Sequence, residues 1–168
     1  MNQVILLLGT NLGDCPKNLK KTINLLEHRN IVITATSSVY KTEPWGYSSD
    51  NWFFNLVIKM ETNMNIISLF EEINKIELDL GREIKTEIGY SDRLIDIDIL
   101  FFNDEVLNSK NLQVPHPRLH SRKFTLLPLS EIMPELIHPV FNKTIRTLLE
   151  ECVDEGKSIK IGSLYNEL

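Results

Sequence analysis

The chain has 168 residues, of which 42% are hydrophobic and 24% charged, and its formal net charge is −5 at pH 7. This length is enough for a packed core, so we expect residues 1–168 to form a single domain. The negative balance argues against general binding to nucleic acids or to membrane surfaces.

The two cysteines, Cys15 and Cys152, are far apart and lie in no metal-binding or redox spacing. This usage is typical of a reducing compartment and predicts neither a zinc site nor a disulfide framework. The N-terminal segment lacks the basic region of a signal peptide, and no apolar run is long enough to span a bilayer. We therefore expect a cytoplasmic protein.

Patterns of strand and helix alternate along the first half of the chain. An apolar run at residues 3–8 predicts a central strand, and the turn that follows leads into a helix that ends near His28. The β-branched residues of 31–41 predict a second strand. Residues 42–51 read as a loop because they are rich in Pro, Gly, Ser and Asn.

The second half begins with a predicted strand at 52–61 and a helix at 65–80, which Gly81 is placed to end. After a polar loop, a further strand runs to Phe102, so the order is β-α-β-β-α-β. This order predicts an α+β, ferredoxin-like fold with an antiparallel sheet. Beyond it we expect a hairpin at Asn103–Asp104, a proline-rich stretch at 115–139 and a helix at 142–152.

The last strand of this core carries two carboxylates in an otherwise apolar run. Side chains alternate across a strand, so Asp96 and Asp98 share one face. The other face carries the apolar side chains Ile95, Ile97, Ile99 and Phe101. Two adjacent anions repel one another unless a cation lies between them, and Mg²⁺ suits carboxylate oxygens. The alternative is a half-solvated strand whose outer face carries two acids.

Basic residues are concentrated in one stretch of this acidic chain. It contains four of the six arginines together with lysines and histidines: Arg82, Lys85, Arg93, His116, Arg118, His120, Arg122 and Lys123. The planar arginine fork matches phosphate geometry, so the stretch indicates a site for a small polyanion. A solvated basic surface that balances nearby acids is the alternative.

Two polar features interrupt otherwise apolar patterns. Asn55 shares a strand face with Phe53, and an amide beside an aromatic ring can bind the edge of a flat heterocycle, although it can also bond to nearby backbone. On the second helix, Phe70, Asn74 and Glu77 form one stripe at helical spacing. From the sequence alone, an ordinary solvated helix flank is the favoured interpretation of that stripe.

Six segments in order resemble the 6-hydroxymethyl-7,8-dihydropterin pyrophosphokinase family of folate biosynthesis. They are Leu8–Gly13, Tyr40–Gly46, Phe53–Asn55, Glu77–Arg82, Arg93–Leu100 and Val114–Phe124. Their spacing is also similar to that of the family over about residues 4–140. A single short motif recurs by accident, whereas six in order are specific.

The resemblance implies that the pyrophosphoryl group of ATP is transferred to the hydroxymethyl oxygen of the pterin, leaving AMP. It implies that Asp96 and Asp98 hold two Mg²⁺ ions and that Arg82, Arg93 and Arg122 take part in catalysis. The matching pterin positions are Thr42, Pro44, Trp45, Phe53, Asn55 and Phe124, with Phe53 and Phe124 sandwiching the ring. The matching nucleotide positions are Phe70, Asn74, Glu77, Arg82, Lys85, Arg93, Ile99, His116 and Arg122. The partners implied are these small molecules, and we expect a monomer.

The chain departs from the family pattern in places. Members often carry Trp-Gly-Pro before the strand arginine, where this chain has Tyr90-Ser91-Asp92, and a tyrosine often stands at the position of Phe53. The tail 155–168 matches no family segment. Two other functions remain open: another metal-dependent phosphoryl or nucleotidyl transferase, and a non-enzymatic ferredoxin-like module that binds a small ligand.

Overall fold

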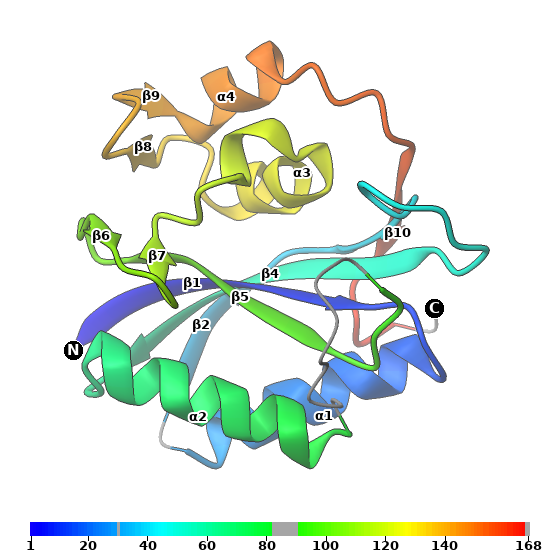
Figure 1. Ribbon diagram of the computed structural model, residues 1–168, viewed down its shortest axis with the longest axis horizontal. Coiled ribbons are helices and arrows are strands. Elements are labelled where there is room, and N and C mark those ends of the chain that lie inside the picture. Colours follow the sequence, from blue (N-terminus) through cyan, green and yellow to red (C-terminus); the bar gives the residue numbers. More distant parts are fainter. Residues whose placement is uncertain (30, 82–90, 167–168) are drawn as a thin grey trace.

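The computed structural model describes residues 1–29, 31–81 and 91–166. Figure 1 shows a twisted sheet with α1 (Cys15–Glu27) and α2 (Ile66–Asp79) on one face. A smaller layer with α3 (Lys123–Ile132) and α4 (Ile145–Glu151) lies on the other face. Among the residues described, no helix is both long and apolar enough to cross a membrane.

The main sheet is antiparallel and has the order β10-β3-β4-β1-β5, with β2 also paired to β4. The strands are β1 (Asn2–Thr10), β2 (Val32–Thr36), β3 (Val39–Thr42), β4 (Phe53–Thr62), β5 (Asp96–Phe102) and β10 (Ser158–Gly162). With two helices packed on one face, this order confirms the predicted ferredoxin-like core.

The strand predicted at 31–41 is two strands, because Ser37 interrupts it. The Ser37 N–H donates to the Val57 carbonyl oxygen at 2.9 Å, and the Ser37 Oγ accepts from the Val57 N–H at 2.9 Å. The hydroxyl thus takes the place of a backbone acceptor in the ladder. β2 and β3 therefore follow one edge of β4 in succession.

Both predicted helices of the core are confirmed, and their ends have local causes. The Asp14 side chain accepts from the Lys17 N–H at the start of α1, and the Asn65 side chain accepts from the Ser68 N–H at the start of α2. Gly81 follows α2 with a φ of +93°, a left-handed conformation that glycine adopts without a Cβ penalty.

The strict alternation predicted for β5 is wrong beyond Ile99, because the strand contains a bulge. Leu6 of β1 pairs with Ile99 and Ile5 pairs with Phe101, so Leu100 is the extra residue. An extra residue moves every later side chain to the opposite face. Phe101 therefore packs with Ile5 on one side of the sheet, while Ile99 packs on the other.

The predictions for the C-terminal half are partly wrong. No hairpin forms at residues 103–104 among the described strands, since β6 (Leu107–Asn108) pairs with β7 (Gln113–Val114). The stretch 115–139 contains a 3₁₀ turn (Leu119–Ser121), α3 and β8 (Ile137–His138), which its prolines concealed. The helix predicted from residue 142 begins later, because β9 (Lys143–Thr144) precedes α4.

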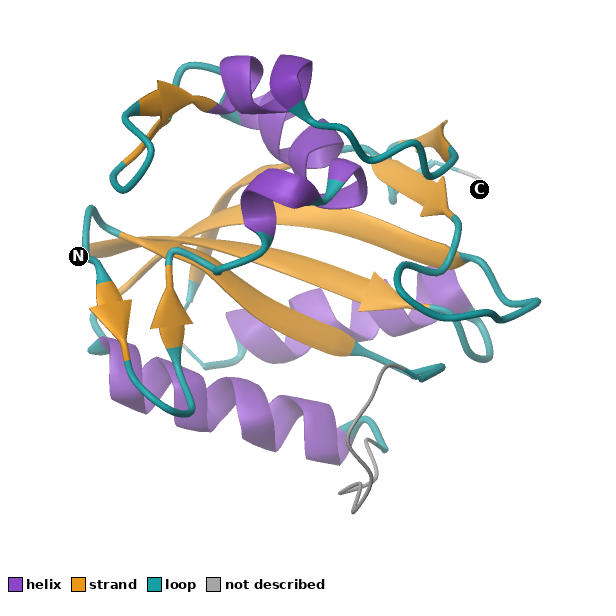
Figure 2. Ribbon diagram, turned by 45° about the horizontal axis from the view of Figure 1, so that its top comes forward, coloured by secondary structure: helices purple, strands orange, loops and turns teal. Residues whose placement is uncertain are grey.

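Figure 2 shows the sheet between two layers of helices. An apolar cluster fills the space on each side of the sheet. The larger one fills the space between the sheet and α1 and α2, with Leu6, Leu8 and Ile58 among its buried members. The smaller one lies between the sheet and α3 and α4, and includes Leu7 and Val57. Because adjacent residues of one strand serve different clusters, both sheet faces are covered.

Candidate active site

A pocket opens on the α3 side of the sheet, at the ends of β1, β4 and β5. Its lining comes from four strands, the loop after β3, the segment before β5, the segment after β7 and the start of α3. The lining residues are Leu7, Gly9, Thr42, Glu43, Trp45, Tyr47, Phe53, Asn55, Ser91, Arg93, Asp96, Asp98, His116, Arg118, Arg122 and Phe124. The pocket thus brings together segments that are distant in the sequence.

The floor of the pocket is a polar row across the sheet. Gly9 of β1 pairs with Asn55 of β4 on one side and with Asp96 of β5 on the other. A Cβ at Gly9 would lie 2.8 Å from the Asn55 Oδ1, closer than real Cβ contacts come. Glycine at this position therefore leaves the space that the Asn55 amide occupies.

The Asn55 side chain is held in place by β3. Asn55 is 3% exposed, and its Nδ2 donates to the Thr42 Oγ1 at 2.8 Å. The amide thus bonds to a side chain, whereas the alternative interpretation predicted a bond to nearby backbone. A buried amide with a fixed orientation can present donor and acceptor groups to the edge of a heterocycle.

Asp96 and Asp98 both line the pocket, as the predicted alternation of β5 requires. The Arg93 Nη1 donates to the Asp96 Oδ1 at 2.5 Å. The Asp98 Oδ2 lies 4.0 Å from the Arg122 Nη1 and 3.9 Å from the His116 Nε2. The pair therefore lies in a pocket beside basic side chains, and both carboxylates are partly exposed.

The electrostatics of the Asp98 carboxyl reflect the crowding of two acids. Desolvation, followed by repulsion from the Asp96 carboxylate, raises the pKa of Asp98 to about 7, although Arg122 acts in the opposite direction. A group in this position gains most from a cation, because a cation removes the repulsion between the two carboxylates. Within the described ranges, no group of three or more Asp, Glu, His or Cys residues is placed to hold a metal.

The wall opposite the sheet joins arginines to aromatic rings. The Arg122 Cζ lies 4.7 Å from the centre of the Trp45 ring and 5.5 Å from that of Phe124. The Arg118 Cζ lies 5.9 Å from the Trp45 ring centre, and the Trp45 and Phe124 rings are 6.5 Å apart. Cation–π contacts of this kind hold guanidinium groups over the pocket.

His116 lies among these cations and is neutral at pH 7. Desolvation comes first among the causes that lower its pKa to about 4, followed by the positive charges of Arg122 and Arg118. Arg93, His116, Arg118 and Arg122 all line the pocket. This part of the predicted basic cluster is therefore gathered around one cavity, in place of the solvated surface of the alternative interpretation.

Five predicted site residues lie outside the pocket lining: Pro44, Phe70, Asn74, Glu77 and Ile99. Ile99 packs in the larger apolar cluster, on the opposite sheet face from Asp98. Glu77 is 2% exposed and its Oε1 accepts from the Ile97 N–H at 2.8 Å, so the interpretation of a solvated helix flank is wrong. Arg82 and Lys85 lie outside the described residues.

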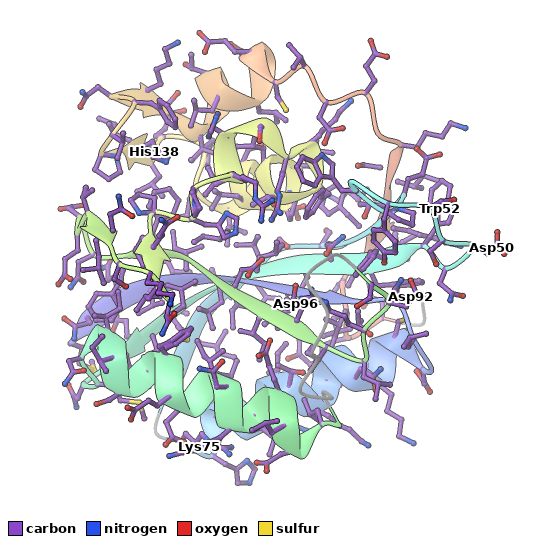
Figure 3. All side chains as sticks on the ribbon, viewed as in Figure 1. Asp50, Trp52, Lys75, Asp92, Asp96 and His138 are labelled. Carbon is purple, nitrogen blue, oxygen red and sulfur yellow. The ribbon has the colours of Figure 1, made fainter. Side chains whose placement is uncertain are left out.

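The sequence interpretation missed contacts that hold the loop after β3. The Asp92 carboxylate accepts hydrogen bonds from Asn11, Tyr47, Ser49 and Asn51. Figure 3 shows Asp92 between Asp96 and the loop that carries Asp50. The one available signal was the position of Asp92, directly before the strand arginine.

Asp154 and the start of the tail, which matched no family segment, support two walls of the pocket. The Lys157 N–H donates to the Glu43 Oε2 at 3.0 Å, and the Glu43 N–H donates to the Lys157 carbonyl oxygen at 3.1 Å. The Asp154 Oδ2 accepts from the Lys123 N–H at 3.0 Å, beside Phe124. Residues 154–157 therefore connect the loop after β3 with the start of α3.

Comparison with known proteins identifies relatives of this chain. A model of the 7,8-dihydro-6-hydroxymethylpterin-pyrophosphokinase family matches residues 5–134. The chain is 39% identical to the 2-amino-4-hydroxy-6-hydroxymethyldihydropteridine pyrophosphokinase of Aquifex aeolicus, over 90% of this chain and 92% of that protein. It is 38% identical to the Bacillus subtilis protein of the same name, over 80% of each chain.

A solved structure with a similar fold is the Plasmodium falciparum HPPK-DHPS, at a TM-score of 0.72 and 22% identity. The match covers 90% of this chain and 43% of that chain, so this chain spans less than half of the Plasmodium protein. At this identity the likeness supports the fold alone. The family match and the two bacterial relatives lead to one assignment: the chain belongs to the 7,8-dihydro-6-hydroxymethylpterin-pyrophosphokinase family.

Proposed function

We propose that the pocket holds ATP and 6-hydroxymethyl-7,8-dihydropterin side by side and that its residues align them for transfer. As a member of its family, the chain transfers the pyrophosphoryl group of ATP to that pterin in folate synthesis. The observation that carries the residue assignment is one cavity lined both by Phe53, Asn55 and Phe124 and by the Asp96/Asp98 pair.

The pterin occupies the end of the pocket nearest β3. Asn55, fixed by Thr42, bonds the edge of the ring, while Phe53 from the sheet and Phe124 from α3 pack on its faces. Flat aromatic faces orient a planar acceptor at a small cost in side-chain entropy. Trp45, which packs on Arg122 and Phe124, closes this end of the cavity.

The triphosphate lies against Arg93, Arg122 and neutral His116. Phosphoryl-type transfer needs in-line alignment and positive charge where negative charge develops, and it needs little covalent chemistry from the protein. The arginines supply charge and direction, since a guanidinium bonds two phosphate oxygens at once. Arg82, Lys85, Phe70, Asn74, Glu77 and Ile99 remain predicted nucleotide residues.

Asp96 and Asp98 fit a site for two Mg²⁺ ions shared with the triphosphate. Carboxylate oxygens are the protein ligands that Mg²⁺ prefers, and phosphate oxygens and water complete its coordination. When bound there, magnesium would neutralise polyphosphate charge and lower the pKa of the acceptor hydroxyl. The raised pKa of Asp98 supports this assignment, because a bound cation would offset the desolvation and the repulsion from Asp96 that raise it.

The single domain, the monomeric state and the cytoplasmic location remain predictions from the sequence. The alternative of a different phosphoryl or nucleotidyl transferase accounts for the acids and arginines but gives no role to Phe53, Asn55 and Phe124.

The test is a nucleotide assay with purified protein, Mg²⁺ and ATP, with and without 6-hydroxymethyl-7,8-dihydropterin. We expect AMP only when the pterin is present, because the group transferred is pyrophosphate. Release of ADP would indicate a different transfer, and absence of turnover with bound pterin would favour a binding module.

A further inference from the structure

We propose that Asp92 is a positioning residue that holds the loop of residues 43–51 against the segment that carries Arg93. We call this loop the acceptor loop because it borders the end of the pocket assigned to the pterin, which accepts the pyrophosphoryl group. In this role Asp92 organises the pterin end of the pocket before substrate arrives. The inference rests on the proposed function for the identity of the ligand, but the contacts that carry it do not.

The acceptor loop provides three of the donors that surround the Asp92 carboxylate. The Tyr47 hydroxyl donates to the Oδ1 at 2.9 Å, the Ser49 hydroxyl to the Oδ2 at 3.0 Å and the Asn51 Nδ2 to the Oδ2 at 2.8 Å. Residues 47–51 of the loop thus bond to one side chain at three points. Such a cluster orders a segment that has no strand or helix of its own.

Asn11 provides the fourth donor and links the cluster to Arg93. Its Nδ2 donates to the Asp92 Oδ1 at 2.8 Å and its Oδ1 accepts from the Arg93 N–H at 2.7 Å. The Asn11 N–H also donates to the Arg93 carbonyl oxygen at 3.0 Å. The acceptor loop, the turn after β1 and Arg93 therefore form one hydrogen-bonded unit.

A carboxylate is suited to this position and an amide is not. An ionised carboxylate has only acceptor sites, about four of them, and here it meets four donors. An asparagine would direct an NH₂ group at some of those donors. Desolvation acts to raise the pKa of Asp92, but the four hydrogen bonds outweigh it and lower the pKa to about 2.

The hydrogen bonds around Asp92 connect the part of the pocket assigned to the pterin with the part assigned to the triphosphate. The Tyr47 ring meets Phe53 edge to face, with ring centres 6.5 Å apart, and both residues line the pocket. On the other side Arg93 bonds Asp96. If the loop is ordered in advance, the pterin does not bear the entropy cost of ordering it, and binding is tighter.

The experiment compares Asp92→Ala and Asp92→Asn with the wild type. The matched control is Asp50→Ala, which removes the same charge from an exposed position in the same loop. The dissociation constant for 6-hydroxymethyl-7,8-dihydropterin is measured by fluorescence titration with a nonhydrolysable ATP analogue present, at a temperature where circular dichroism shows every variant folded. We expect it to rise about tenfold or more for both Asp92 variants, as loss of hydrogen bonds to a charged group implies.

A double-mutant cycle separates positioning from a general loss of stability. If Asp92 acts through the Tyr47 hydroxyl, Tyr47→Phe weakens pterin binding by itself, and adds less when Asp92 is already alanine. Additive effects, or pterin binding by Asp92→Ala as tight as that of Asp50→Ala, would overturn the inference. If Asp92→Ala does not fold, unchanged pterin binding by Tyr47→Phe overturns it equally.

The assay keeps this inference separate from the proposed function. If the wild type forms AMP and the Asp92 variants bind the pterin as tightly as the wild type, the positioning role of Asp92 is contradicted and the proposed function stands. If the wild type binds the pterin without forming AMP, the proposed function is contradicted. The titration still shows whether Asp92 affects pterin binding.

Discussion

The two faces of the sheet use the same strands in different ways. On the α1 and α2 face, Val4, Leu6 and Leu8 of β1 all contribute to one buried apolar cluster. On the other face, the apolar cluster ends at Leu7 and Val57. Past that point the sheet carries Gly9, Asn55 and Asp96, which form the floor of the pocket.

The difference arises from the length of the covering layer. Helices α1 and α2 run along the sheet, whereas α3 and α4 cover only part of the opposite face (Figures 1 and 2). Where the cover stops, polar side chains can remain partly hydrated and meet a ligand. One face therefore stabilises the fold, and the uncovered end of the other face supplies the chemistry. Four substitutions test this division.

The largest effect is expected at the acidic pair. Asp98→Ala should lower turnover by about 10³-fold while the melting temperature changes little, because the carboxylate acts on the ligand and not on the fold. The measurements are AMP formation and a thermal melt. Asp104→Ala, at an exposed acid just after β5, is the control. Near-normal turnover in Asp98→Ala would contradict the metal role.

A substitution on the sheet face covered by α1 and α2 should affect stability and not binding. Leu6→Ala removes a fully buried side chain from the larger cluster and should lower the free energy of unfolding by about 3 kcal/mol. Pterin affinity of the folded protein should change little. Urea unfolding measures the first quantity and titration the second. Ile67→Ala, at a side chain 54% exposed on α2, should leave both unchanged.

A third effect concerns the layer that covers the second face. His138 is 3% exposed and packs on Phe101, with ring centres 5.5 Å apart. Desolvation, with a smaller contribution from His120, lowers the pKa of His138 to about 4, below the value of about 6.5 expected when unfolded. Between these pH values the folded state binds fewer protons than the unfolded state. The contribution of neutral, buried His138 to the free energy of unfolding is therefore complete above about pH 6.5 and is lost as the pH falls toward 4.

The corresponding variant is His138→Gln. The wild type should lose about 2 kcal/mol more than this variant between pH 7 and pH 4, as measured by urea unfolding across that range. His28→Gln, at an exposed histidine, should keep the pH dependence of the wild type. Equal slopes for the wild type and His138→Gln would rule out this source of acid sensitivity.

The smallest effect is expected on the pocket floor. Gly9→Ala places a methyl group 2.8 Å from the Asn55 Oδ1, and the short amide, bonded to Thr42, can move only by giving up its orientation. Pterin affinity should fall about tenfold, with stability nearly unchanged. In an Asn55→Ala background the same substitution should have little further effect. An equal loss in both backgrounds would show that Asn55 is not the group displaced.

Local patterns were sufficient for much of the site. A period of two residues placed Asp96 with Asp98 on one side of their strand. The same period placed Phe53 with Asn55 on one side of theirs, because backbone pleating alone sets those directions. Capping residues and Gly81 determined the ends of α1 and α2 through bonds within a few residues. These features depend on near neighbours, so the sequence predicts them.

Features that depend on distant partners were decided by the tertiary structure. The bulge at Leu100 arises from pairing with β1, α3 contains Pro128 within its helical span, and β10 forms only against β3. The Asp92 cluster joins residues that are 41 to 81 positions apart, which no local periodicity records. Within each regular stretch of strand or helix, the residue pattern predicts which side chains share a face. Bulges and the contacts between faces depend on residues far apart in the chain, because such contacts form when separate elements pack.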